Sequence, residues 1–415
     1  MNYFTYQQDQ LYAEKIPFVD IAQRFGTPCY VYSRSAIEQQ WRSYELALAS
    51  RPHLICYAVK ANSNIAILNL LARLGSGFDV VSAGELARVI KAGGDPRKVV
   101  FSGVGKQAQE MEMALRAGIK CFNVESIPEL HLLNTVAGQL HCKAPVSIRV
   151  NPDVDANTHP YISTGLKENK FGVGIEEAET VYRTAAGLEH LQITGIDCHI
   201  GSQITSTGPH IDATRRIIRL MARLKSAGIN LKHIDIGGGL GITYADGTPP
   251  DPSVFINEVT REITDDSIEV LIEPGRSIVG NAGVLLTTVL YVKEAGHKNF
   301  AIVDAAMNDL IRPVLYDAWQ QILSVRQHIS SPKRAYDVVG PICETGDFLG
   351  LDRMLTIASG DLLAICSAGA YGFAMSSNYN SRTRAAEVLV DQDQMYEIRQ
   401  REHIEELYRG EQILP

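Results

Sequence analysis

Between about residue 53 and residue 273, short runs of apolar residues alternate with longer amphipathic stretches. The amphipathic stretches place apolar residues on one helical face, and a glycine follows each of them closely, as at a typical helix end. They predict helices that include residues 65–74, 84–92, 107–117 and 213–227. Strands that alternate with helices in this rhythm form parallel βαβ units, so the pattern predicts an α/β fold.

The apolar runs are the predicted strands of that fold. They occupy residues 53–59, 77–81, 98–102, 119–124, 146–150, 193–199, 233–236 and 270–272. Eight strands with crossover helices are typical of a (β/α)8 barrel, and a doubly wound open sheet is the alternative.

A different pattern begins after residue 283, where strand-like runs follow one another without regular helices between them. These runs lie at residues 284–291, 300–303, 335–339, 353–357, 361–364 and 386–390. They predict a mostly β domain over residues 284–415. The apolar segment at 27–32, which contains Pro28, is expected to add a strand to it. We therefore expect residues 1–32 to join the β domain and residues 33–283 to form an inserted barrel.

Length and composition agree with a globular protein of this size. Of the 415 residues, 45% are hydrophobic and 21% are charged, which excludes a disordered or collagen-like chain. The 39 basic and 47 acidic residues give a net charge of -8, which argues against a general nucleic-acid binder. The N-terminus lacks the features of a signal peptide and no apolar stretch reaches membrane length. A cytoplasmic protein without a nucleic-acid or membrane partner is expected.

Cysteine usage points to free thiols. The seven cysteines are irregularly spaced and form no C-x-x-C pair. Cys343 differs from the others in its context, because it lies between Pro341 and Glu344 in a turn-like segment, whereas Cys121 and Cys366 lie in apolar runs. In a reducing compartment such a thiol is available for chemistry.

The first candidate for chemistry is Lys60, which ends the first predicted strand in the segment 56–62. Barrel strands present their carboxyl ends to the active site. A lysine at a strand end is ordinarily solvated, but one held in a pocket can act as an amine nucleophile toward a carbonyl group.

Glycines follow the seventh strand at 237, 238, 239 and 241. Backbone N–H groups of such a run can approach an oxyanion closely, and barrels commonly hold a phosphate there. The alternative is a tight turn, and the spacing does not fit a dinucleotide fingerprint. A second glycine segment at 103–108 fits the looser dinucleotide pattern but is interpreted as a strand-to-helix turn.

Two further segments close the sixth and eighth strands. In 273–276, Glu273 could hold a proton on a ring nitrogen and Arg276 could clamp a carboxylate or phosphate; a surface turn with an ion pair is the alternative. In 197–203, His199 could stack on a cofactor ring and Ser202 could bind its phosphate. A metal site is disfavoured there because no second His or Cys pair lies at ligand spacing.

Taken together, the segments 57–62, 199–202, 237–241, 273–276, 343–347 and 370–372 resemble the fold-type III pyridoxal-phosphate decarboxylases, in order along nearly the whole chain. The pair Cys343-Glu344, where ornithine-specific relatives carry Cys-Asp, and the run 151–171 are similar to the diaminopimelate branch. The resemblance implies decarboxylation of meso-2,6-diaminopimelate to L-lysine and carbon dioxide, the last step of lysine synthesis. Action on ornithine, arginine or carboxynorspermidine is the alternative.

The resemblance also implies roles for single residues. Lys60 would carry pyridoxal phosphate covalently, His199 would stack on its ring, and Glu273 would keep the ring nitrogen protonated. The phosphate would be surrounded by Ser202, Gly239, Gly241, Gly275 and Arg276. The substrate would be held by Arg276, Arg312, Tyr316, Glu344 and Tyr371, of which Tyr371 would also touch the cofactor.

Cys343 would return a proton to the α-carbon after carbon dioxide has left. Members of this family are homodimers that build each site from both subunits, and the partner would donate the loop with Cys343 and Glu344. No metal is expected. Small barrels of the same fold that only bind the cofactor lack a β domain, which this chain carries.

Overall fold

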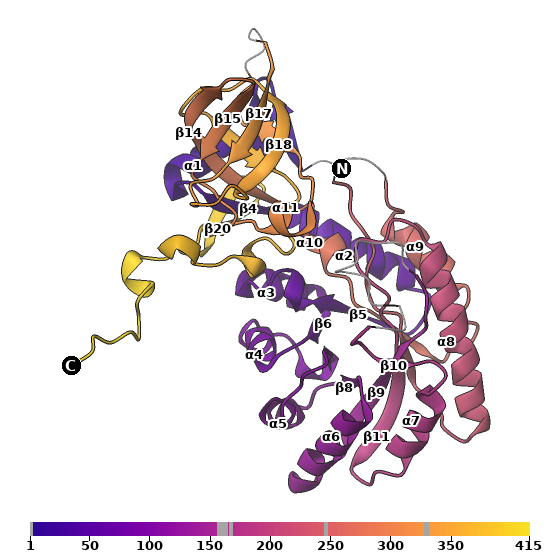
Figure 1. Cartoon of the computed structure of the whole chain (residues 1–415). Helices are drawn as coiled ribbons and strands as arrows, with labels where there is room; N and C mark the ends of the chain where they lie inside the picture. The colour runs from indigo at the N-terminus through magenta and orange to yellow at the C-terminus, as the bar shows by residue number, and fades with distance from the viewer. Residues whose placement is uncertain (1–2, 156–164, 166–168, 245–247, 328–331) are drawn as a thin grey trace. The chain divides into compact units, whose positions relative to one another are not determined.

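The computed structural model describes residues 3–155, 165, 169–244, 248–327 and 332–415. The chain divides into two compact units, which are described separately. The barrel unit consists mainly of Gln40–Ile242 and Thr248–Ser277, and the β-rich unit mainly of residues up to Gln39 and of Ile278–Pro415. Figure 1 shows the elements of both units in chain order.

The barrel unit contains a closed barrel of eight parallel strands. They are β5 (His53–Ala58), β6 (Gly77–Val80), β7 (Val99–Phe101), β8 (Cys121–Val124), β9 (Ala144–Asn151), β11 (Leu191–Asp197), β12 (His233–Asp235) and β13 (Glu269–Ile272). Pairing of β13 with β5 closes the ring. The predicted barrel is therefore confirmed, with each predicted strand present, and the open-sheet alternative is wrong. A short strand, β10 (Val173–Gly174), pairs with β9 outside the ring.

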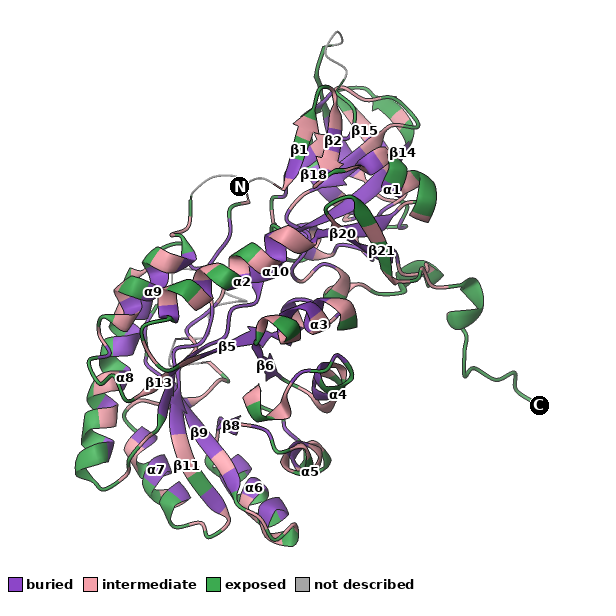
Figure 2. Cartoon of the chain, turned by 180° about the vertical axis from the view of Figure 1, so that it is seen from behind, coloured by how far each residue is buried: buried purple, intermediate pink, exposed green. Residues whose placement is uncertain are grey.

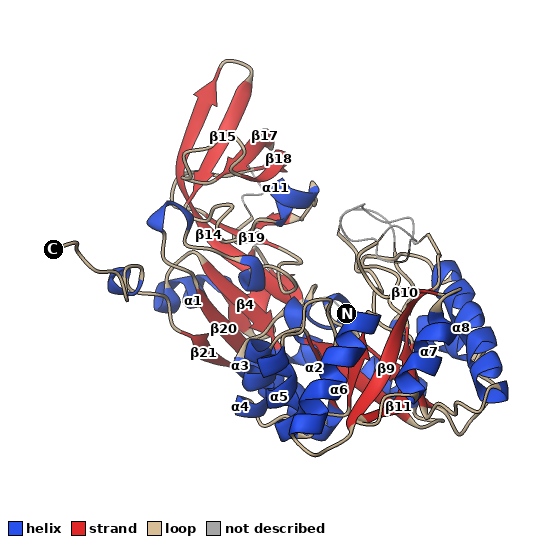
Figure 3. Ribbon diagram, turned by 60° about the horizontal axis from the view of Figure 1, so that its bottom comes forward, coloured by secondary structure: helices blue, strands red, loops and turns tan. Residues whose placement is uncertain are grey.

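Helices connect these strands around the outside of the barrel. They are α3 (Ile65–Leu74), α4 (Ala83–Lys91), α5 (Ala108–Ala117), α6 (Ile127–Gln139), α7 (Ala178–Ala186), α8 (Gly208–Ser226) and α9 (Pro252–Thr260), with 3-10 turns at Val59–Ala61 and Pro96–Lys98. Figure 3 shows α6 and α7 beside the barrel strand β9. Serine side chains cap the N-termini of α4 and α6. The Oγ atoms of Ser82 and Ser126 accept hydrogen bonds from the N–H groups of Glu85 and Glu129 at 3.2 and 3.3 Å. Among the described residues, no helix is both long and apolar enough to span a membrane.

These helices are amphipathic: residues on the face toward the strands are buried, and residues on the opposite face are exposed to solvent (Figure 2). The barrel strands themselves are buried almost throughout, and one cluster in the interior joins Leu54, Cys56, Val100, Cys121 and Leu271. Several buried polar residues, among them Asp79, Arg149, Asp197 and Asp235, lie in the carboxyl-terminal halves of their strands.

The β-rich unit is built around β4 (Cys29–Ser33), which pairs antiparallel with β14 (Gly283–Ala295) and parallel with β20 (Ala386–Asp391). The predicted strand at 27–32 is thus confirmed as part of the β-sheet. The other strands are β1 (Phe4–Gln7), β2 (Gln10–Ala13), β3 (Ile16–Pro17), β15 (Lys298–Val303), β16 (Ile322–Ser324), β17 (Arg334–Val339), β18 (Phe348–Leu355), β19 (Leu362–Ile365) and β21 (Gln394–Arg399). Its short helices include α1 (Phe18–Phe25) and α11 (Arg312–Tyr316). The helix α2 (Arg34–Leu48) begins in this unit, and α10 (Arg276–Val279) begins in the barrel unit and ends in this one.

One predicted strand of this unit is displaced. The run at 353–357 was expected to be a strand, but β18 begins at Phe348 and ends at Leu355. Pairing with β17 carries two register shifts, and Asp352 adopts a positive φ of 54° in the middle of the strand. This irregularity breaks the period-two alternation of apolar side chains, so the first half of the strand carries no pattern that the sequence alone could identify.

The glycine segment at 103–108 is a strand-to-helix turn between β7 and α5, as predicted. The Nζ of Lys106 donates to the carbonyl oxygens of Gly103 and Asn123 and to Oε1 of Glu129, each at 2.7 Å. The Lys106 and Glu129 side chains are almost completely buried. The ammonium group thus holds the turn against the next strand and helix.

Replacement of Lys106 tests this buried pair. In Lys106→Ala the Glu129 carboxylate stays buried without its cation, so we expect a loss of about 3 to 5 kcal/mol in the free energy of unfolding, measured with urea. Lys91→Ala, on the exposed side of α4, is the matched control and is expected to change it by less than about 0.5 kcal/mol. Equal effects of the two substitutions would contradict the account.

Candidate active site

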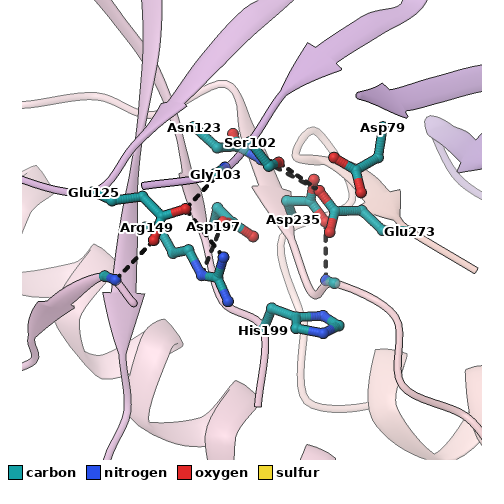
Figure 4. A network of polar contacts seen from close by, with 12 residues as sticks. Asp79, Ser102, Gly103, Asn123, Glu125, Arg149, Asp197, His199, Asp235 and Glu273 are labelled. Atoms are coloured by element: carbon teal, nitrogen blue, oxygen red, sulfur yellow. Dashed lines mark hydrogen bonds and ion pairs between the residues drawn. The ribbon is translucent and has the colours of Figure 1, made fainter. Parts of the chain in front are cut away.

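Polar side chains converge at the carboxyl ends of the barrel strands (Figure 4). They come from different strands and the turns behind them: Lys60, Asp79, Ser102, Asn123, Glu125, Arg149, Asp197, His199, Asp235 and Glu273. Parallel strands of a closed barrel end at one rim, so residues far apart in the sequence meet there.

Lys60 lies in the 3-10 turn directly after β5 and pairs with Asp79 on β6. Its Nζ is 2.7 Å from Oδ2 of Asp79. The Lys60 side chain is 36% exposed, whereas that of Asp79 is 0% exposed. A buried carboxylate therefore fixes the amine at the rim of the barrel, in reach of a molecule bound there.

The glycine run after β12 passes close to neighbouring backbone. A Cβ atom on Gly238 would lie 2.1 Å from the carbonyl oxygen of Glu273, and one on Gly239 would lie 2.5 Å from that of Gly201. Gly237 and Gly239 have positive φ angles of 69° and 106°. Only glycine fits these positions, and the run presents backbone rather than side chains to the rim.

His199 is a neutral imidazole. The N–H of Gly238 donates to its Nδ1 at 3.1 Å, which places the ring proton on Nε2. Burial lowers the pKa of His199 well below its usual value, and the positive charges of Arg149 and Lys60 lower it further. The ring therefore adds a flat polar surface without adding charge.

Glu273 follows β13 and is buried. Its Oε1 accepts hydrogen bonds from Ser102 Oγ at 3.4 Å and Asn123 Nδ2 at 3.3 Å. Burial raises the pKa of Glu273 well above its usual range, and the charge of Asp235 raises it next. Such a group retains a proton, or shares one with a basic ring nitrogen beside it.

Ser202 and Arg276 meet on the same rim, because Nε and Nη2 of Arg276 donate to Ser202 Oγ at 3.3 and 3.0 Å. Gly275 packs against Ala58 and Ala61, the neighbours of Lys60, and Gly241 against Ile204. The structure thus brings together all predicted site residues of the barrel unit: Lys60, His199, Ser202, Gly239, Gly241, Glu273, Gly275 and Arg276.

The β-rich unit carries the remaining predicted residues in two groups. In the first, the Arg312 guanidinium lies over the rings of Tyr316 and Tyr371, at 5.2 and 5.9 Å from their centroids, and over that of Tyr244 at 5.7 Å. Arg312 is only 5% exposed. Tyr244 was not predicted.

The second group is the loop of Cys343 and Glu344. The Cys343 N–H donates to Asn380 Oδ1 at 3.2 Å, and the Tyr379 hydroxyl donates to Glu344. All seven cysteines are free, and Cys343 is the exposed one. By contrast, burial raises the pKa of the Cys29 and Cys366 thiols to about 12, so Cys343 is the thiol that solution reaches most readily.

Sequence reasoning missed the buried charges behind the site. Glu125 accepts the N–H of Gly103 at 2.9 Å and Arg149 Nη1 at 3.2 Å, while Arg149 Nε lies 3.9 Å from Asp197 Oδ2. A signal existed for them, because a charged residue inside an otherwise apolar barrel strand must find a partner. The segment 151–171 was identified above by its resemblance to the diaminopimelate branch, and its residues 156–164 and 166–168 lie outside the described residues.

Comparisons with known proteins show which family this chain is similar to. The family model for the pyridoxal binding domain of pyridoxal-dependent decarboxylases matches residues 34–280. A diaminopimelate decarboxylase of Pseudomonas aeruginosa is 60% identical over 415 residues, with 100% of both chains covered. One of Vibrio cholerae is 57% identical over 417 residues, again with 100% of both covered.

Solved structures give the same picture. Diaminopimelate decarboxylase from Helicobacter pylori complexed with L-lysine is 44% identical, with a TM-score of 0.91, and the match covers 94% of this chain and 98% of that one. The enzyme from M. jannaschii in complex with L-lysine is 36% identical, with a TM-score of 0.95, and the match covers 100% and 98%. The similarity thus extends over both units.

Gly238→Ala tests the close approach of the glycine run. A methyl group 2.1 Å from a backbone oxygen forces the run to move, so we expect purified protein to lose its bound pyridoxal phosphate and to unfold at lower urea concentration. Gly208→Ala, where a Cβ meets nothing within 4 Å, is the control and should behave like wild type. Unchanged cofactor content in Gly238→Ala would show that the run is not part of the site.

Proposed function

This chain belongs to the pyridoxal-dependent decarboxylases, and within them to the diaminopimelate decarboxylases, and we propose that the residues described above divide the work of that reaction. The protein is a pyridoxal-phosphate-dependent carboxy-lyase that converts meso-2,6-diaminopimelate to L-lysine and carbon dioxide. The assignment of roles is supported mainly by one observation: Lys60, the glycine run and Glu273 lie together at the rim of the barrel.

The rim fits pyridoxal phosphate. The glycine run leaves no room for a Cβ and exposes backbone to a phosphate, and Glu273 offers a buried carboxyl group to the ring nitrogen. When bound, pyridoxal phosphate accepts the electron pair that remains on the α-carbon after carbon dioxide leaves. The amine of Lys60 holds the cofactor covalently, and Asp79 keeps that amine in position.

Of the residues around the cofactor, one group controls the proton on its ring nitrogen and another binds its phosphate. Glu273 holds a proton at the ring nitrogen, and neutral His199 covers the ring without opposing that positive charge. Ser202, Gly239, Gly241, Gly275 and Arg276 bind the phosphate through hydroxyl and backbone donors. Arg276, held by Ser202, also faces a substrate carboxylate.

Substrate choice rests on charge. We assign Arg312, Tyr316 and Tyr371 to the substrate, with Arg312 pairing a carboxylate, and Glu344 to an ammonium group. Diaminopimelate has a second carboxylate that ornithine and lysine lack. A substrate without this second carboxylate forgoes the ion pair with the buried Arg312, which costs about 1 to 3 kcal/mol, so a less acidic amine binds less well.

Cys343 returns the proton to the α-carbon, and it does so in the active site of a partner subunit. Its exposure on the described chain supports this role, because a thiol donated to another subunit must lie on the surface of its own. The proposed assembly is a homodimer with shared active sites. We place it in the cytoplasm, in keeping with seven free thiols.

Lys60→Ala is expected to purify without the visible absorbance of covalently bound cofactor and with turnover below about one thousandth of wild type. Borohydride reduction of wild type, followed by peptide mass analysis, should find the pyridoxyl group on the peptide that contains Lys60. A modified peptide elsewhere, or unchanged absorbance of the variant, would remove Lys60 from this role.

Cys343→Ala is expected to keep its cofactor and to lose about 100-fold to 10,000-fold in kcat, since a positioned proton donor contributes that much. Cys142→Ala, which removes another thiol that is not fully buried, is the control and should retain wild-type kcat. If the rate of Cys343→Ala matched wild type, a different group would deliver the proton.

Mixed dimers test the shared site. Refolding Lys60→Ala together with Cys343→Ala gives some dimers in which one site has both residues intact, so about a quarter of wild-type activity is expected at equal mixing if exchange is complete. Absence of any regain, in mixtures shown to contain heterodimers, would mean that each site uses residues of one chain.

A further inference from the structure

Asp235 has no part in the roles assigned so far. It is the last residue of β12, its side chain is completely buried, and Figure 4 shows its carboxyl group beside that of Glu273. One carboxyl oxygen from each of Asp197, Asp235 and Glu273 lies within 4.8 Å of the other two.

One oxygen of Asp235 holds the glycine run. Its Oδ1 accepts the N–H of Gly237 at 2.9 Å. The next residue, Gly238, is held on both sides, by His199 at its N–H and by His210 Nε2, which is 2.9 Å from its carbonyl oxygen. Asp235 therefore connects the proposed phosphate loop to the interior of the barrel.

The other oxygen of Asp235 faces the acidic cluster, where burial raises the pKa of Asp235 and a hydrogen bond with the Glu273 side chain lowers it. No amide, hydroxyl or amino group of the described residues reaches Oδ2. Among those residues, Asp79 pairs with Lys60 and Asp197 lies against Arg149, whereas no cation is within ion-pair distance of Asp235 or Glu273. Two buried carboxyl groups this close, without a cation at ion-pair distance, cannot both be ionised, so Asp235 and Glu273 keep at least one proton between them, and an ionised Asp235 opposes loss of that proton from Glu273.

The pKa values of both acids are raised, and burial is the main cause. Burial raises the pKa of Asp235 to about 7. The pKa of Glu273 is raised well above its usual range, first by burial and then by Asp235. Both shifts are in the direction expected of two buried carboxyl groups that share a proton.

Other titratable and charged groups also lie near Asp235. They are the thiols of Cys56 on β5, Cys121 on β8 and Cys198 after β11, Asp79 on β6, Arg149 on β9, Asp197 on β11 and Lys60 after β5. Burial raises the pKa of each of the three thiols, so they remain neutral. The two cations are already paired with Asp79, Glu125 and Asp197.

We infer that Asp235 is a positioning residue with two separable functions: its negative charge holds the proton on Glu273 and the ring nitrogen, and its Oδ1 fixes the phosphate loop. The inference rests on the proposed function, because it requires the cofactor ring at Glu273. It assigns catalytic control to a residue that touches neither the cofactor ring nor the substrate.

Asp235→Asn separates the two functions, since an amide keeps the acceptor for Gly237 and removes the charge. In the holoenzyme we expect the alkaline limbs of kcat and of the cofactor absorbance to move to lower pH by about one unit, a tenfold loss of proton affinity. Cofactor affinity should stay within about threefold of wild type. Asp235→Ala should show the same pH shift and, in addition, at least about tenfold weaker cofactor binding.

Asp197→Asn is the matched control. It removes an equally buried carboxyl group of the same cluster, but one that lies 3.9 Å from a cation, Arg149, so a smaller shift is expected. If Asp235→Asn does not fold, Asp235→Ser is measured instead, because its hydroxyl is also a neutral acceptor. Unshifted pH profiles, a larger shift in Asp197→Asn, or failure of both Asp235 variants to fold would overturn the inference.

A bound cation is the rival explanation for three adjacent acids. Metal analysis of purified holoenzyme is expected to find no divalent ion in stoichiometric amount, and one ion per chain that Asp235→Asn removes would overturn the inference. Failure of the proposed function looks different: wild type itself would then lack cofactor absorbance or fail to release carbon dioxide from diaminopimelate.

Discussion

Burial of carboxyl groups at one end of the barrel is the constraint on which the site depends. A carboxylate removed from water must take a proton or find a cation, and among the described residues Lys60 and Arg149 are the cations that pair with this cluster of carboxylates. Asp79 pairs with Lys60, Glu125 and Asp197 share Arg149, and Asp235 and Glu273, which have no cation at ion-pair distance, retain a proton between them. A basic ring nitrogen is the ligand that such an arrangement suits.

The same constraint explains why the site combines rigid backbone with neutral side chains. His199 could not carry a charge next to Arg149 without cost, and it is held neutral by burial and by the N–H of Gly238. Gly237 and Gly238 are held through Asp235, His199 and His210. Phosphate binding and proton control therefore depend on one connected set of hydrogen bonds, and a change at Asp235 affects both.

Sequence patterns predicted the barrel because apolar runs and glycine-terminated helices are local signals. They also predicted His199, Glu273 and the glycine run, since these follow strands in recognisable segments. Asp79, Arg149 and Asp235 were missed because their importance comes from pairing across the barrel: Asp79 meets Lys60 only when β5 and β6 lie side by side. The strand at β18 was misplaced because a positive φ at Asp352 interrupts its alternation.

The acidic, cofactor-binding rim is expected to act on a substrate with two carboxylates. A comparison of kcat/KM for three amino acids is the sharpest test of this expectation. Purified holoenzyme is incubated with meso-diaminopimelate, L-ornithine or L-arginine at equal concentration, and released carbon dioxide is measured. The account predicts release from meso-diaminopimelate with L-lysine as the product, and kcat/KM at least about tenfold lower for the other two. A higher kcat/KM for ornithine or arginine would contradict it.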